Sequence, residues 1–150
     1  MSLLTPELLA NIGRRSEPRR EIVTRRDIRK YAVSTDNRQR KYLDGDLAPP
    51  MFHVPLFWDV VALDQLSPDG VSIDTLLPKF PLEKAMAGGL QIEYHKPIRP
   101  GDWLTATRTL TDIYEKEGRS GPLIFYEVIM EVVDDDGELV IREKTTRILR

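Results

Sequence analysis

The strongest constraint on the fold is a β-rich pattern that starts at Gly89 and runs to the C-terminus. In residues 123–133 the apolar side chains fall on alternate positions. These positions are Ile124, Tyr126, Val128, Met130 and Val132. Glu127 and Glu131 fall between them. Since successive side chains of a strand point to opposite faces, this pattern predicts a strand with one buried and one solvated face.

Three further strands are predicted around this one, because the same chemistry recurs between turn-forming residues. They cover residues 90–94, 103–114 and 139–149. The intervening turns are rich in Pro, Gly and Asp and lie at residues 97–102, 117–121 and 134–137. Such clusters are typical of tight reversals. The second half of the chain is therefore predicted to be a meander of four antiparallel strands, with one apolar face that must be covered.

The first half of the chain is predicted to hold short helices and loops. Thr5-Pro6-Glu7 is typical of a helix start, and Gly13 is a natural stop. Residues 19–23 are predicted to form a short strand. Thr24 is then predicted to cap a second helix, with Asp27 three residues later.

Only residues 57–66 form a strongly apolar stretch that is long enough for a central helix, whereas residues 71–87 show little periodicity. We therefore expect an α+β fold in which the antiparallel sheet curls around one buried helix. The 150 residues fit a single domain. Residues 1–18 are predicted to be an N-terminal helix and extension, and residues 19–150 the main domain.

Charge is unevenly distributed, although the net charge is only −2. Residues 14–41 carry eleven Lys or Arg against four Asp or Glu, a local net charge of +7. This segment is either a solvated basic face or a surface that meets phosphates, such as those of coenzyme A, or an acidic acyl carrier protein. Nucleic acid is disfavoured, because interleaved aromatic residues and a helix-turn-helix pattern are missing.

Several classes of protein are disfavoured by composition. The chain contains no cysteine, which excludes disulfides, thiolate metal sites and a cysteine nucleophile. No apolar run is long enough to span a membrane, and no signal-peptide pattern opens the sequence. We therefore expect a cytoplasmic protein.

Three stretches, taken in order, resemble MaoC-like hot-dog proteins, the (R)-specific enoyl-thioester hydratase/dehydratase family. Residues 88–102 read GGLQIEYHKPIRPGD, which is similar to the strand and K/R-P-[IVL]-x-x-G-D turn of that family. Residues 115–122 resemble its next hairpin, and residues 31–52 resemble its N-terminal domain. The likeness extends to the small hydroxyacyl-ACP dehydratase subunits and to the first half of mesaconyl-CoA-type hydratases.

The resemblance implies a hot-dog fold that dimerises side by side and holds an acyl thioester at the interface. It also implies hydration of a trans-2-enoyl thioester, or the reverse dehydration. An Asp and a His activate one water, and backbone N–H groups polarise the thioester carbonyl. No metal or redox cofactor is required, and coenzyme A or an acyl carrier protein enters as part of the substrate.

The segment that should carry the acid–base pair differs from the family motif Gly-Asp-x-Asn-Pro-x-His. It reads TDNRQRKY over residues 35–42, so Asp36 matches the aspartate while Lys41 or Tyr42 falls where the histidine belongs. In the two-subunit dehydratases that the chain resembles, one subunit is catalytically silent and lends a wall of the acyl pocket. We therefore expect a subunit that pairs with a catalytic hot-dog partner.

Three alternatives remain open from the sequence. A free-standing homodimer would use a rearranged site with Asp36 and His53 as catalytic residues. A non-enzymatic acyl-CoA-binding module would bind without turnover. A thioesterase on the same fold is the third alternative.

The predicted substrate-binding residues are Asn37, Tyr42, Met51, Phe52 and Arg119, and no metal site is predicted. Met51 and Phe52 would offer backbone N–H groups at the start of the central helix. His95 is expected to be exposed.

Other patterns have ordinary structural explanations. Phe57, Trp58 and Val61 are expected in the core or an interface rather than along an acyl chain. Ser120 has no evident catalytic companions. Residues 134–137, DDDG, are explained by a hairpin turn rather than a calcium loop.

Overall fold

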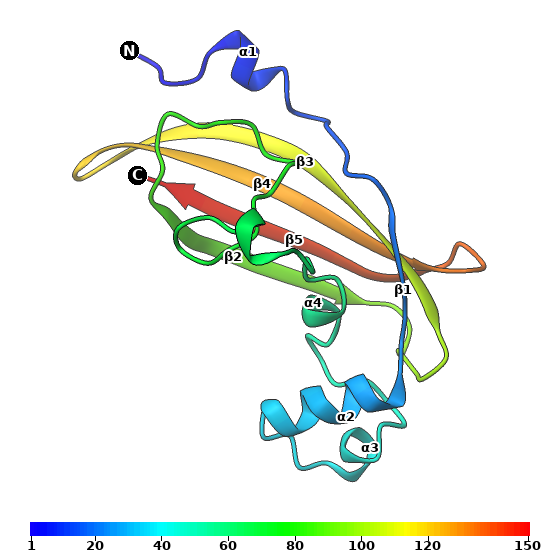
Figure 1. Cartoon of the computed structure of the whole chain (residues 1–150). Coiled ribbons are helices and arrows are strands. Elements are labelled where there is room, and N and C mark those ends of the chain that lie inside the picture. The colour runs from blue at the N-terminus through cyan, green and yellow to red at the C-terminus, as the bar shows by residue number, and fades with distance from the viewer.

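The computed structural model describes all 150 residues, and its main element is one five-stranded antiparallel sheet (Figure 1). Its strand order is β1-β3-β4-β5-β2. The strands are β1 (Arg19–Ile22), β2 (Ala85–Tyr94), β3 (Trp103–Gly118), β4 (Gly121–Asp134) and β5 (Leu139–Leu149). All predicted strands are present, and β2, β3 and β4 are longer than predicted.

The predicted four-strand meander is wrong in one respect. β3, β4 and β5 follow one another, but β2 pairs with β5 at the far edge instead of with β3. The free edge of β3 is taken by β1 and by residues 13–16, where Gly13 N–H donates to the Leu110 carbonyl and Ser16 N–H to that of Arg108. Because this edge is filled, β2 pairs at the opposite side of the sheet.

The alternating pattern of β4 is confirmed, since its five apolar positions are all buried. They divide into two core clusters. The first cluster gathers Val23, Ile28, Phe52, Ile98, Leu104, Ala106, Met130, Val132, Val140 and Ile141. The second gathers Leu8, Leu76, Leu110, Ile113, Ile124, Tyr126, Val128 and Leu149.

Polar residues lie between the two clusters on the same face of the sheet. Arg108 of β3 and Glu143 of β5 both pair in register with Met130 of β4, so all three side chains share one face. The interior of the curled sheet is therefore apolar at both ends and polar in the middle.

The predicted N-terminal helices are confirmed. Helix α1 (Pro6–Leu9) is capped by Thr5, and α2 (Arg25–Ser34) by Thr24, whose side chain accepts from Asp27 N–H. A further short helix, α3 (Arg40–Leu43), lies beside α2 at one end of the molecule (Figure 1). Whether residues 1–18 form a separable extension stays a prediction, although Leu8 belongs to the second core cluster.

The predicted central helix over residues 57–66 is wrong. The structure has the four-residue helix α4 (His53–Leu56) and a single 3₁₀ turn, η1 (Leu63–Gln65). The chain between them is irregular. Asp59 in this segment accepts a hydrogen bond from Arg19 of β1, which holds the segment against the sheet. β-branched Val60 and Val61 also favour an extended chain. The predicted irregular excursion is confirmed for most of residues 71–84, and β2 begins at Ala85.

None of the helices is long and apolar enough to cross a membrane.

We expect the second core cluster to be essential for stability. Leu110→Ala should lower the free energy of unfolding by about 2–5 kcal/mol, because Leu110 is fully buried and its removal leaves a cavity. Leu63→Ala is the matched control. Leu63 is 86% exposed, so a change within about 0.5 kcal/mol is expected. Urea denaturation measures both, and equal losses would contradict the assignment of the core.

Candidate functional site

A polar hollow of about 700 Å³ lies where the end of α2 meets the chain between α3 and α4. Its lining is Tyr31, Thr35, Asp36, Asn37, Arg38, Gln39, Pro49 and Pro50. Asp36 adopts a left-handed backbone, with φ of 51°. Its exposed carboxylate accepts from Arg38 Nε at 3.0 Å. Asn37 Oδ1 accepts from Gln39 N–H at 3.2 Å, which fixes the turn after α2. The predicted residues Asp36 and Asn37 are thus brought together.

The Pro50–Met51 peptide is held from both sides by two tyrosines. Tyr31 of α2 donates to the Pro50 carbonyl across 3.5 Å, and Met51 N–H donates to Tyr94 Oη of β2 at 3.2 Å. Met51 has φ of 69°, and it and Asp36 are the only non-glycine residues with positive φ. Such strain persists only where the surroundings fix it, and it concentrates at functional sites.

The backbone donors predicted at this turn are already engaged. Met51 N–H meets Tyr94, and Phe52 N–H donates to the Pro49 carbonyl at 3.2 Å. The Phe52 side chain is buried in the first core cluster. A role for these N–H groups in polarising a thioester stays a prediction, and it requires them to exchange these partners.

A second hollow, which we call the apolar groove, shares Tyr31 with the polar hollow. It has a volume of about 580 Å³, and five of its seven lining residues are hydrophobic. The lining consists of Tyr31, Ser34, Met51, Val54, Pro55, Trp58 and Val60. Burial, followed by the proximity of Tyr94, raises the pKa of Tyr31, so its phenol stays protonated and neutral where the two hollows meet.

His53 is fully buried and lies apart from Asp36. Its Nε2 is 2.6 Å from Oε2 of Glu143, and its Nδ1 has no hydrogen-bond partner. Burial alone would raise the pKa of Glu143, but the hydrogen bond to His53 and that from Thr145 lower it overall. Glu143 is therefore ionised, and His53 Nε2–H donates to it. His53 lines a third hollow of about 320 Å³ instead of the polar hollow.

The structure does not bring His53 and Asp36 together. The carboxylate partner of His53 is Glu143 instead. Sequence reasoning missed Glu143, although a signal existed. Glu143 lies two residues from buried Ile141 in β5, so strand periodicity places it on the inner face. A carboxylate at an inward position needs a buried partner.

The remaining predicted residues are dispersed. Tyr42 is buried and lines the third hollow. Arg119 lies exposed at the tip of the β3–β4 hairpin, far along the sheet from α2 and α3 (Figure 1). His95 is exposed as predicted. Phe57 packs against the first core cluster, whereas Trp58 and Val61 are exposed, so a place in the core is wrong for these two and a place in an interface stays a prediction.

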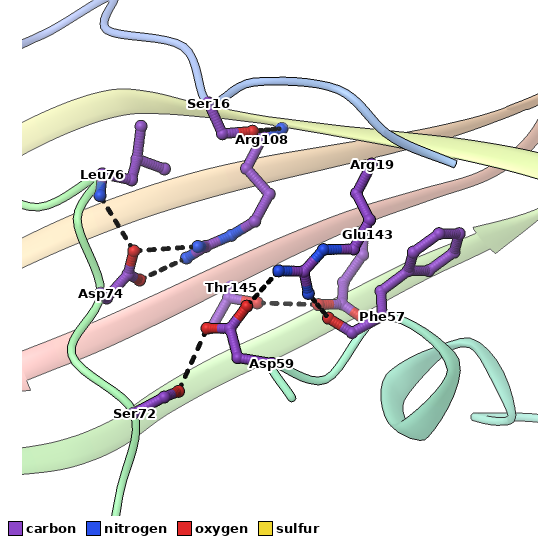
Figure 2. Close-up of polar contacts among 10 residues, drawn as sticks. All are labelled: Ser16, Arg19, Phe57, Asp59, Ser72, Asp74, Leu76, Arg108, Glu143 and Thr145. Carbon is purple, nitrogen blue, oxygen red and sulfur yellow. Dashed lines mark hydrogen bonds and ion pairs between the residues drawn. The ribbon is translucent and has the colours of Figure 1, made fainter. Parts of the chain in front are cut away.

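A network of ion pairs fastens residues 57–77 to the sheet (Figure 2). Arg19 donates to Asp59 and to the Phe57 carbonyl, and Ser72 donates to the other oxygen of Asp59. Arg108 binds Asp74 through both terminal nitrogens, at 3.0 and 2.7 Å. Burial would raise the pKa of Asp59, but its hydrogen bonds from Arg19 and Ser72 lower it overall. No cluster of three or more His, Cys, Asp or Glu is suited to hold a metal ion.

Comparison with known families identifies the chain. Residues 10–143 match the model of the FAS1-like, dehydratase domain region. The chain belongs to this family. The match covers most of the chain, and it confirms the resemblance to MaoC-like dehydratases.

The relatives of this FAS1-like dehydratase-region protein agree with that assignment. Mesaconyl-C(4)-CoA hydratase of Chloroflexus aurantiacus is 31% identical over 103 residues, which are 63% of this chain and 37% of that protein. The chain thus spans just over a third of the length of this curated relative.

Solved structures show the same fold at low sequence identity. The ChsH1–ChsH2 complex of Mycobacterium tuberculosis matches with a TM-score of 0.71 and 17% identity, over 95% of this chain and 86% of that one. The R-hydratase PhaJ1 of Pseudomonas aeruginosa matches with a TM-score of 0.62 and 16% identity. This match covers 92% of this chain and 81% of that one. These likenesses confirm the hot-dog fold.

We expect Glu143 to stabilise the fold through His53. Glu143→Leu should lower the free energy of unfolding by about 1–3 kcal/mol, because it leaves both buried ring nitrogens without a partner. Glu131→Leu is the control on β4. Its ion pair with Arg142 is exposed, so under about 1 kcal/mol is expected. Similar losses in chemical denaturation would refute the buried pair.

We expect the Asp59 anchor to make stability depend on acid pH. Because the pKa of Asp59 lies below its ordinary value of 3.8, its ionised form stabilises the fold above that pH and loses this effect as pH falls through the lowered pKa. Asp59→Asn should therefore have a lower melting temperature than the wild type at neutral pH. This difference should shrink below pH 3.8. Exposed Asp69→Asn is the control and should show no gap. A constant gap for Asp59→Asn would count against the anchor.

Proposed function

We propose that this chain is a hot-dog unit of an acyl-thioester hydratase/dehydratase, and that it completes its active site with a second hot-dog unit. The reaction adds water across the C2–C3 double bond of a trans-2-enoyl thioester, or removes it. A base takes a proton from water as oxygen bonds to C3, and a proton is delivered to C2. The carbonyl oxygen must be stabilised while charge develops on it.

One observation carries the half-site proposal. The polar hollow holds a carboxylate, Asp36, where the family places its acid–base pair, but no imidazole lines it. Of the two histidines, His53 is buried against Glu143 and His95 lies exposed after β2. A partner would therefore supply the missing imidazole, and this chain would supply the binding surface around Tyr31.

The relatives support the same arrangement. The mesaconyl-C(4)-CoA hydratase is much longer than this chain, which leaves room for a second unit. Two of the similar solved structures are named as complexes, ChsH1–ChsH2 and HadBC, the latter a 3R-hydroxyacyl-ACP dehydratase.

A free-standing enzyme is the second candidate, and one observation favours it. Glu143 orients the His53 ring and leaves Nδ1 without a partner, as in a carboxylate–imidazole pair that acts as a general base. Since Nδ1 is buried, this candidate requires α4 to move before substrate reaches it.

Steady-state hydration of crotonyl-CoA and of a longer trans-2-enoyl-CoA distinguishes the two candidates. We expect no turnover by the chain alone. Turnover should appear when it is co-purified with a hot-dog protein of the same organism that carries both Asp and His. A partner variant without its histidine should lose about 10²–10⁴-fold in rate.

Turnover by the chain alone that His53→Ala abolishes would replace the half-site proposal with the free-standing enzyme. Saturable binding of acyl-CoA without turnover in any combination would instead leave an acyl-CoA-binding module. Glu138→Gln, at the exposed β4–β5 turn, is the control for nonspecific loss of rate.

A further inference from the structure

We propose that the apolar groove binds the acyl group of the substrate, and that this group is an uncharged aliphatic chain rather than one that ends in a carboxylate. The inference rests on the proposed function only in taking a thioester as the ligand. The class of acyl group comes from the groove itself.

The chemistry of the groove selects against charge. Its walls are the side chains of Tyr31, Met51, Val54, Trp58 and Val60, completed by Ser34 and Pro55. No Lys, Arg or His lines it. A carboxylate placed there would lose part of its water and gain no cation, which is unfavourable. An aliphatic chain loses only unfavourable contact with water.

The position of the groove fits an amphipathic ligand. Tyr31 lines both the apolar groove and the polar hollow, so the two adjoin at its side chain. The polar hollow offers Asp36, Asn37 and Arg38. A thioester that lies across Tyr31 would direct its polar part toward these residues and its acyl part into the groove. The phenol that separates them is held neutral, because burial raises its pKa.

Residues 58–60 form the outer wall of the groove, and their side chains point alternately toward the groove and away from it. Trp58 and Val60 face the groove, whereas Asp59 between them turns inward to Arg19 and Ser72. Arg19 also donates to the Phe57 carbonyl at 2.9 Å, so Trp58 is fixed on both flanks (Figure 2). Arg19 and Asp59 are therefore positioning residues for this wall.

The wall of the groove is anchored by the chain itself, through the bonds of Arg19 to Asp59 and to the Phe57 carbonyl. Trp58 is 58% and Val60 99% exposed, so a second copy of the chain is the competing occupant. The two occupants differ in a measurable way, since binding of a copy depends on protein concentration and binding of an acyl group does not.

Tryptophan fluorescence provides the test, since the chain has only two tryptophans. Trp103→Phe leaves Trp58 as the sole reporter. This variant is titrated with butyryl-CoA, succinyl-CoA and free coenzyme A. The butyryl and succinyl groups both have four carbons, and only the succinyl group ends in a carboxylate. We expect a saturable change with butyryl-CoA, about tenfold weaker affinity for succinyl-CoA, and no Trp58 response to free coenzyme A.

A second set of variants tests whether a cation in the wall of the groove changes the preference between the two acyl groups. Val60→Arg, at a fully exposed position that folding does not require, places a cation in the wall and should narrow or reverse the preference for butyryl-CoA. Val71→Arg, at an exposed position outside the lining, should leave the preference unchanged. Asp59→Asn should weaken the binding of butyryl-CoA, because it loosens the wall of the groove. Asp69→Asn should leave this binding unchanged.

Equal or tighter binding of succinyl-CoA overturns the inference, and so does a Trp58 signal that follows protein concentration instead of ligand. If butyryl-CoA binds but the fluorescence of Trp58 does not change, the acyl group does not lie in the groove. The further inference is then overturned, while the proposed function stands. If no acyl-CoA binds and no partner gives turnover, both proposals fail.

Discussion

The structure depends on one requirement, which is that the apolar face of a curled antiparallel sheet must be covered. In this chain a four-residue helix and an irregular excursion cover it. Two ion pairs, Arg19 with Asp59 and Arg108 with Asp74, hold residues 57–77 against the sheet. Partly buried ion pairs contribute less stability than apolar packing, but their geometry is more specific. The cover is therefore positioned by directed contacts, and the wall of the apolar groove is positioned with it.

Local signals explain what the sequence predicts well. Alternation in β4 and the Thr24 cap of α2 act within a few residues, so they can be recognised without knowing the rest of the fold. The helix predicted over residues 57–66 fails for the opposite reason. Asp59 finds its partner forty residues earlier in the chain, and the apolar content of the stretch gives no sign of that contact. The place of β2 likewise depends on residues 13–16, which fill an edge of β3.

The candidate site was predictable where the family motif reaches and, at one further residue, from strand periodicity. The resemblance located Asp36 and Asn37 in one turn, and the structure places both in the polar hollow. Glu143 was readable from strand periodicity, since it shares the inner face with Ile141. The left-handed backbone of Met51 had no sequence signal, because it follows from contacts made by Tyr31 and Tyr94 rather than from the residue itself.

The single peptide between Pro50 and Met51 joins α2 to β2 through its carbonyl and its N–H. Tyr31, at one end, borders the polar hollow and the apolar groove, and Tyr94, at the other, borders the hollow beside His53. A displacement of either ring would therefore be passed to the other ring through this peptide. One amide group thus links the rims of three hollows within a single small domain.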